Sequence, residues 1–244
     1  GATFKRDNAG FLPRLLDKMY QDRVVYKDKM MKAKKLYQET KDDKYKNEIA
    51  RCHNIQWAKK IALNSAYGAI GNQYFRYYDV RQATAITSSG QLVIRHIEKE
   101  VNNYMNKILE TENEDYIVAS DTDSIYLKLD SLVEKTCKDK TLDQKVNFID
   151  KVAQQKIEPF IEKCFNDLAD YTNAFEQRMV MKREVISDKA IWTAKKRYML
   201  HVLDDEGIRL TKPKMKIMGI EAVKSSTPEV CRGKIKEAID IMMT

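Results

Sequence analysis

Apolar residues recur at helical spacing through the first third of the chain. Between residues 11 and 40 most of them fall three or four positions apart, and Pro13 suits the first turn of a helix. A second helical pattern runs from residue 45 to about residue 72, after a polar stretch at residues 40–43. The pattern predicts two helices joined by a short turn, which together form an antiparallel hairpin of roughly 40 Å.

The period of the pattern changes after a third predicted helix at residues 83–108. Residues 116–119 are apolar, residues 120–123 are typical of a turn, and residues 124–129 alternate with period two. This combination predicts a β-hairpin.

The rest of the chain mixes both periods. Helices are expected over residues 142–168 and 228–244, and strands over residues 178–186, 191–193, 198–203 and 207–210, with a turn at residues 204–207. The predicted fold class is therefore α+β, with a helical hairpin that projects from a body whose antiparallel β-sheet packs on helices.

Composition excludes several classes of protein. The 244 residues allow one large domain or two small ones. No stretch approaches the ~20 consecutive apolar residues of a membrane span, and residues 1–10 are too polar for a secretory leader. The four cysteines are scattered and form no CxxC pair, so neither a zinc ribbon nor a disulfide framework is indicated. A reducing, cytoplasmic location is expected.

The charge distribution suggests one class of ligand. The net charge is +8, and residues 1–60 hold 16 of the 44 basic and 8 of the 36 acidic residues, so the whole excess lies in the first quarter of the chain. A local positive field attracts phosphates. A solvated helical surface has the same composition, and charge alone leaves both interpretations open.

Two carboxylates occupy the tip of the predicted β-hairpin, in Asp121-Thr122-Asp123-Ser124. Positions i and i+2 of an extended chain point to the same side, so Asp121 and Asp123 would repel each other unless a cation lies near. Mg²⁺ takes one or two carboxylates together with water and phosphate oxygens, and phosphoryl transfer with two metal ions needs such ligands. An ordinary turn also favours Asp, Thr and Ser, and the motif by itself favours the ordinary turn over a metal site.

A second group of polar residues follows one face of the second predicted helix. Lys60, Asn64 and Tyr67 lie at i, i+4 and i+7, and Arg23 and Lys27 are spaced i, i+4 on the first helix of the hairpin. Three cations from two helices could bind a triphosphate. A surface lysine and a packed tyrosine are the alternative. The tryptophans Trp57 and Trp192 are expected to be packing anchors.

A third basic group lies near the end of the chain. Lys195-Lys196-Arg197-Tyr198 leads into a predicted strand, and residues 182–224 contain 11 basic and 6 acidic residues. Lys212, Lys214 and Lys216 alternate, which puts them on one face of an extended segment, spaced to follow a phosphate backbone. A charged edge strand protected against aggregation is the alternative.

Taken in order, these segments resemble the motifs of family B DNA polymerases. Lys60…Asn64-Ser65…Tyr67-Gly68 is similar to the KxxxNSxYG motif of the fingers, the hairpin tip to the DTDS motif of the palm, and Lys196-Arg197-Tyr198 to the KxY motif. Residues 72–79, 83–87, 216–221 and 224–228 are similar to the replicative polymerases of tailed bacteriophages. The resemblance runs essentially from end to end.

The resemblance implies a division of the chain and a role for each matching residue. Residues 1–10 would end the first palm segment, residues 11–72 would form the fingers, residues 73–219 the palm, and residues 220–244 the start of the thumb. In the fingers, the implied deoxynucleoside triphosphate ligands are Arg23, Lys27 and Lys60, with Asn64 beside them and Tyr67 near the nascent base pair.

In the palm, the resemblance implies that Asp121 and Asp123 are the catalytic carboxylates. Asp123 would be the principal metal ligand, Asp121 an auxiliary one, and Glu184 would lie nearby; the complete enzyme would use two Mg²⁺ ions. Primer-template DNA would be bound by Lys196, Tyr198, Lys224 and Ser225.

The sequence departs from the family in what it lacks. The DxxSLYPS palm motif that lies upstream of the fingers in this family, the exonuclease domain and nearly all of the thumb have no counterpart in the 244 residues. The expectation is a fragment, fingers plus palm, of a template-directed DNA polymerase that extends a primer 3′-end but does not polymerise alone.

Several alternatives and partners accompany this expectation. The chain could be one piece of a split polymerase, a non-catalytic remnant that binds DNA or nucleotide, or a basic hairpin that only mediates assembly. The expected partners are primer-template DNA, deoxynucleoside triphosphates, the missing polymerase segments and a sliding clamp, with no membrane, in the host cytoplasm for a viral protein.

Overall fold

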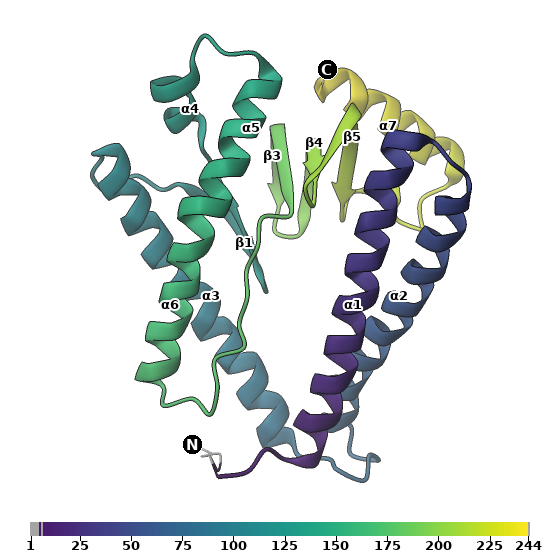
Figure 1. Ribbon diagram of the computed structural model, residues 1–244, viewed down its shortest axis with the longest axis vertical. Coiled ribbons are helices and arrows are strands. Elements are labelled where there is room, and N and C mark those ends of the chain that lie inside the picture. The colour runs from purple at the N-terminus through teal and green to yellow at the C-terminus, as the bar shows by residue number, and fades with distance from the viewer. Residues whose placement is uncertain (1–4, 6, 244) are drawn as a thin grey trace. The chain divides into compact units, whose positions relative to one another are not determined.

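The computed structural model describes residue 5 and residues 7–243. The predicted palm segment at residues 1–10 therefore lies partly outside the described residues, as does the last residue of the predicted thumb. The helices are α1 (Phe11–Thr40), α2 (Lys44–Ile70), α3 (Val80–Leu109), α4 (Asp130–Cys137), α5 (Leu142–Val152), α6 (Glu158–Tyr171) and α7 (Glu229–Met243) (Figure 1). A π-helical turn, η1 (Ala153–Ile157), joins α5 to α6, and a 3₁₀ turn, η2 (Glu221–Val223), precedes α7.

The strands are β1 (Ile117–Asp121), β2 (Ser124–Leu127), β3 (Val185–Ala194), β4 (Arg197–Asp205) and β5 (Ile208–Met218). The first two pair antiparallel, and the last three form an antiparallel sheet in the order β3-β4-β5. Mixed helices and antiparallel sheets confirm the predicted α+β class.

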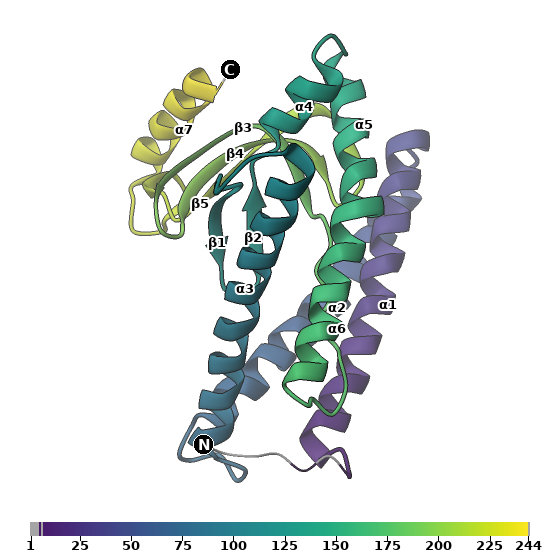
Figure 2. The same cartoon turned by 90° about the vertical axis from the view of Figure 1, so that its left-hand side faces the viewer.

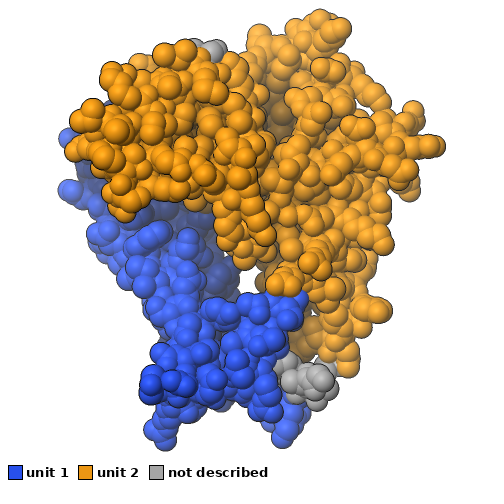
Figure 3. All heavy atoms as spheres, turned by 180° about the vertical axis from the view of Figure 1, so that it is seen from behind, with its two compact units in different colours: residues 1–89 blue, residues 90–244 orange. Residues whose placement is uncertain are grey.

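The chain divides into two compact units, residues 1–89 and residues 90–244, coloured separately in Figure 3. The boundary falls inside α3, so this helix contributes its first turns to one unit and the remainder to the other. None of the helices in the described ranges is long and apolar enough to cross a membrane.

The first unit is built on a hairpin of α1 and α2, as the helical spacing predicted. The polar turn lies where it was expected: Lys41 ends α1 in the left-handed region with φ 57°, and the Asp42 carboxylate accepts the Lys44 N–H at 3.0 Å. Across the hairpin, Lys59 Nζ pairs with Asp22 Oδ2 at 2.9 Å. The buried positions are few, namely Met30, Ala33, Cys52, Gln56 and Ile70.

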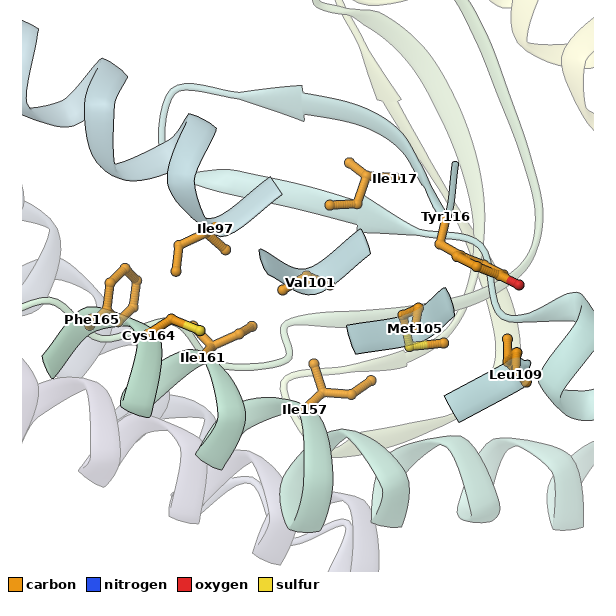
Figure 4. Close-up of a cluster of buried hydrophobic side chains, with 10 residues drawn as sticks. All are labelled: Ile97, Val101, Met105, Leu109, Tyr116, Ile117, Ile157, Ile161, Cys164 and Phe165. Carbon is orange, nitrogen blue, oxygen red and sulfur yellow. The ribbon is translucent and has the colours of Figure 1, made fainter. Parts of the chain in front are cut away.

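The core of the second unit includes a cluster that packs α3 against α6, η1 and β1 (Figure 4). Four residues of α3 spaced four apart supply one side of it, because that spacing keeps side chains on one helix face. The buried members are Ile97, Val101, Met105, Leu109, Tyr116, Ile117, Ile157, Ile161, Cys164 and Phe165.

The three-stranded sheet has different side chains on its two faces. Tyr198, Leu200 and Val202 of the central strand β4 form one buried cluster. On the other face, Met199 packs with Ile239 of α7, which lies beside the sheet in Figure 2. Successive side chains of a strand point to opposite faces of the sheet, so Met199 lies on the face opposite Tyr198 and Leu200.

Two predicted boundaries in the β regions are wrong. The turn of the first hairpin is shorter than residues 120–123, since Asp121 pairs with Ser124 and only Thr122 and Asp123 remain in the turn. The predicted strand at residues 178–186 begins only at Val185.

Side-chain contacts of Arg183 explain the late start of β3. Its N–H donates to the Glu158 carboxylate at 2.8 Å, and its guanidinium pairs with both Asp150 and Asp204. Asp204 is almost fully buried and also accepts the Gly207 N–H at 3.0 Å. The backbone at Arg183 is thus held by helix side chains rather than by a neighbouring strand.

The predicted strand at residues 124–129 is also too long, since β2 ends at Leu127. The predictions of strands after residue 190 identified the right segments and underestimated their length. Residues 191–193 belong to β3, which is continuous from Val185 to Ala194. The segment predicted at residues 207–210 continues as β5 to Met218 and includes the three alternating lysines.

Candidate functional site

The tip of the β1–β2 hairpin presents two carboxylates at different depths. Asp121 ends β1 with its side chain half-buried, and Asp123 is exposed in the turn. Between them, Thr122 has a φ of 53°, an unusual conformation for a β-branched residue, and the Asp123 N–H donates to the Asp121 carbonyl at 2.6 Å. Thr122 Oγ1 also donates to Asp121 Oδ1 at 3.0 Å. The tip is a tight turn held by its own polar groups.

A lysine from the β3–β4 turn reaches this tip. Lys196 Nζ lies 3.6 Å from Asp121 Oδ1. Two motifs far apart in the sequence, the paired carboxylates and Lys195-Lys196-Arg197-Tyr198, therefore meet in one place. The geometry places an exposed lysine ammonium beside a half-buried carboxylate.

The turn that carries Lys196 rests on the end of β5. Lys196 itself has a left-handed φ of 63°, and Gly219 has a φ of 66°. A Cβ on Gly219 would lie 2.2 Å from the Lys196 carbonyl oxygen, so only glycine fits there. The contact explains why a glycine follows β5 at this point.

An acidic residue joins the same turn to the start of the predicted thumb. Glu221 pairs with the Arg197 guanidinium and, through its other oxygen, with Lys224 Nζ at 3.0 Å. These contacts lower the pKa of Glu221, chiefly through the Lys224 hydrogen bond. Ser225 is exposed next to Lys224. Through Glu221, the DNA-binding candidate Lys224 is linked to Arg197, the direct neighbour of the candidate Lys196.

Tyr198, also a DNA-binding candidate, lies in the interior with only 8% of its surface exposed. Its hydroxyl is 2.8 Å from that of Tyr126, and its ring packs against Tyr126 and Trp192. Burial raises the pKa of Tyr198, and the Tyr126 hydrogen bond and the charges of Asp121 and Glu184 add to this effect.

The donor set fits a divalent cation in part. Within the described part of the chain, no three His, Cys, Asp or Glu side chains are grouped closely enough to form a metal centre. Asp121 and Asp123 alone offer two carboxylates, which matches the number that Mg²⁺ takes when phosphate and water complete its shell. The predicted set of Asp121, Asp123 and nearby Glu184 is therefore open and would need oxygens from other molecules or segments.

The predicted triphosphate ligands all lie in the first unit. Lys60, Asn64 and Tyr67 are exposed or half-buried on one face of α2, and Arg23 and Lys27 are half-buried on α1. The ion pair between Asp22 and Lys59 joins the direct neighbours of Arg23 and Lys60, so these two cations lie at the same level of the hairpin. Asp123 belongs to the other unit, so the triphosphate and metal assignments rest on separate observations.

Sequence reasoning missed the surroundings of Lys60. The expectation that Trp57 packs in a core is wrong, since 48% of it is exposed and Lys60 Nζ lies over its ring, 5.3 Å from the centroid. The sequence did contain a sign of this contact, because Trp57 and Lys60 are three residues apart and residues at that spacing are neighbours on a helix surface. Trp192 does pack against Tyr126 and Tyr198, as expected.

Lys212, Lys214 and Lys216 lie on β5 as the alternation predicted. Lys214 stands opposite Val202 and Lys216 opposite Leu200 on the neighbouring strand. Lys212 and Lys214 are exposed, and Lys216 is half-buried. The strand is at the edge of the sheet, so both a phosphate-binding row and a protected edge remain compatible with its position.

Comparison with known proteins gives a consistent match along the whole chain. The family model described as DNA polymerase family B matches residues 2–244. The DNA-directed DNA polymerase of Escherichia phage RB69 is 40% identical over an alignment of 234 residues that covers 92% of this chain and 26% of that protein. The DNA-directed DNA polymerase of Enterobacteria phage T4 is 44% identical over 194 residues, 75% of this chain and 22% of that protein.

A relative with lower sequence identity also matches nearly the whole chain. DNA polymerase 1 of Pyrococcus abyssi (strain GE5 / Orsay) is 26% identical over 242 residues, 98% of this chain and 25% of that protein. The chain thus spans about a quarter of the length of these curated relatives.

Proposed function

This chain belongs to DNA polymerase family B, and on that premise we propose that it forms the fingers and most of the palm of a template-directed DNA polymerase. The resemblance to the family and to phage polymerases that the sequence motifs indicated is confirmed. The proposed division is palm at residues 1–10, fingers at 11–72, palm at 73–219 and thumb from 220 to 244. The proposed reaction is attack of a primer 3′-hydroxyl on the α-phosphate of a deoxynucleoside triphosphate, with release of pyrophosphate.

The observation that carries the proposal is the contact between Lys196 and Asp121 at 3.6 Å. Phosphoryl transfer needs anionic metal ligands beside cations that hold the primer backbone. The hairpin tip supplies the carboxylates, and the β3–β4 turn supplies the lysine. Lys224, connected to the same turn through Glu221, extends the basic side of the site toward duplex phosphates.

Asp121 and Asp123 are the proposed ligands of the divalent cations, with Glu184 nearby. When bound, Mg²⁺ would lower the pKa of the attacking hydroxyl and neutralise charge on the leaving pyrophosphate. Lys196 would exchange its contact with Asp121 for a contact with primer phosphate. Tyr198 would support the primer strand from the aromatic cluster that it forms with Tyr126 and Trp192.

The triphosphate is proposed to bind on the α1–α2 hairpin. Arg23 offers a bidentate donor pair, and Lys27 and Lys60 offer point charges. Asn64 would hydrogen-bond beside them, and Tyr67 would pack near the nascent base pair. The position of Lys60, Asn64 and Tyr67 on one helix face supports this assignment.

A chimera tests the proposal. Residues 1–244 would replace the matching quarter of the T4 phage polymerase, and primer extension with Mg²⁺ would be measured. We expect template-directed extension by the chimera, its loss on Asp123→Asn, and no extension by the 244 residues alone, since the family's second palm carboxylate is not among them. Glu112→Gln, a carboxylate change in the α3–β1 loop, is the matched control and should extend normally.

The alternative is a non-catalytic remnant that binds DNA or nucleotide. It predicts a folded chimera that binds primer-template but does not extend it. Extension that survives Asp123→Asn would contradict the assignment of this carboxylate, and extension by the 244 residues alone would contradict the proposed need for a second segment.

A further inference from the structure

Trp57 is a large ring exposed on a helix surface. Nearly half of it remains accessible, although an exposed indole gains little of the free energy that its burial would supply. It lies three residues before Lys60 and four after His53, so the three side chains share one face of α2. An exposed tryptophan in this setting points to a role other than core packing.

Both neighbours contact the ring. Lys60 Nζ lies 5.3 Å from the centroid of Trp57, within the range in which the negative face of an indole attracts an ammonium group. The His53 ring lies 6.0 Å away with the two planes only 12° apart, in a stacked arrangement. The stack restrains the indole, and the indole in turn restrains the lysine.

The adjacent lysines Lys59 and Lys60 have different partners. Lys59 is committed to Asp22 across the hairpin at 2.9 Å. Lys60, by contrast, forms no ion pair with any residue for which the structure gives a position. Its ammonium is therefore restrained by an aromatic face and keeps its hydrogen-bond donors available.

We propose that Trp57 is a positioning residue for Lys60, which it holds over the exposed face of α2 before a triphosphate arrives. The inference rests on the proposed function, in which Lys60 binds the triphosphate. An ammonium has three N–H donors and can donate to phosphate oxygens while it remains over the ring. A lysine that is already restrained loses less side-chain freedom on binding, so the affinity is higher.

The first measurement tests the contact itself. Because the chain has two tryptophans, Trp192→Phe leaves Trp57 as the single source of indole fluorescence. In this background, Lys60→Met should change the Trp57 emission intensity, whereas the matched Lys59→Met, which removes the adjacent lysine, should leave it nearly unchanged. Equal emission from the parent and Lys60→Met would overturn the proposal.

The second measurement tests the consequence for binding. Inorganic tripolyphosphate would be titrated calorimetrically into the 244-residue chain, with helix content checked by circular dichroism. Trp57→Leu, which keeps an apolar side chain without a π face, should weaken binding about two- to fivefold, and Trp57→Tyr should retain most of the affinity.

The outcomes separate the two proposals. If the parent chain, Trp57→Leu and Trp57→Tyr all bind tripolyphosphate with equal affinity, the positioning role is overturned while the triphosphate site stands. If the parent chain binds no tripolyphosphate, the proposed triphosphate site fails, and the fluorescence comparison of Lys60→Met with Lys59→Met still decides whether Trp57 holds Lys60.

Discussion

At the residue scale, one glycine decides where a candidate DNA-binding lysine stands. The Lys196 turn and the end of β5 approach so closely that a single added carbon at Gly219 would meet the Lys196 carbonyl oxygen at 2.2 Å. The left-handed φ of 66° adds a second requirement for glycine. The backbone at Gly219 therefore fixes the position from which Lys196 reaches Asp121.

Gly219→Ala should lower the free energy of unfolding by about 1–3 kcal/mol, because the new methyl group forces the Lys196 turn to move. Urea denaturation measures the change. Gly233→Ala is the matched control: Gly233 lies within α7 with no atom near the added carbon, so this change should raise the stability by about 0.5–1 kcal/mol. A stability loss of the same size in both variants would contradict the close contact.

At the scale of elements, α3 begins at a charged cap. The Asp79 carboxylate accepts the Arg81 N–H at 2.9 Å and pairs with the Arg81 guanidinium at 2.9 Å. Capping satisfies N–H groups that a helix start leaves without partners. The hydrogen bonds from the Arg81 side chain, followed by those from backbone N–H groups, lower the pKa of Asp79 to about 2, against the opposing effect of burial.

The start of α3 should accordingly lose stability in acid. The pKa of Asp79 is about 2 in the folded chain and ordinarily 3.8, so its contribution is complete above about pH 4 and is lost as the pH falls toward 2. NMR titration of the Arg81 amide should give a midpoint near the lower value. Arg81→Met should move that midpoint upward, and Asp79→Asn should abolish the titration while keeping a capping side chain. A midpoint near 3.8 in the parent chain would contradict the structure.

At the scale of the whole molecule, charge is divided unequally between the two units. Residues 1–89 contain 18 basic and 9 acidic residues, and residues 90–244 contain 26 basic and 27 acidic ones. The first unit therefore has a net positive field of the kind that attracts polyanions, whereas the second unit is nearly neutral and offers a polyanion only individual cations such as Lys196. Any attraction of a polyanion to the second unit would therefore come from individual cations and not from the net charge of the unit.

Lys196→Ala should weaken binding of primer-template DNA at every sequence and flatten the dependence of log affinity on log salt by about one unit. Fluorescence anisotropy over a series of salt concentrations gives this slope. Lys138→Ala removes the same charge from the end of α4 and should leave the slope unchanged. Equal slopes for Lys196→Ala and the parent would count against a phosphate contact.

Local pattern was sufficient for most of the elements. Helical spacing of apolar residues identified α1, α2 and α3, a short apolar run identified β1, and the period of two identified β2. The same reasoning failed at residues 178–184, where a strand was predicted and β3 begins only at Val185. There the Arg183 side chain and N–H are bound by carboxylates from α5, α6 and β4, and no sequence pattern reports such long-range partners.

In the candidate site, too, the residue types were predictable from local motifs, whereas the contacts between distant segments were not. Motif spacing proposed Asp121, Asp123 and Lys196 as candidates one by one, and the same motifs indicated the family that the comparisons show. The pairing of Lys196 with Asp121 and the burial of Tyr198 beside Tyr126 were not predictable, since they depend on which strands pair and in what register.

The sequence by itself determined the family, most of the elements and the residue types at the candidate site, because these depend on local periodicity and on motifs read along the chain. Only the tertiary structure decided that Trp57 is exposed beneath Lys60, that Gly219 supports the Lys196 turn, and that Glu221 joins Arg197 to Lys224. The physical reason is that these contacts arise from side-chain geometry and from strand pairing between distant segments, and neither leaves a periodic trace in the sequence.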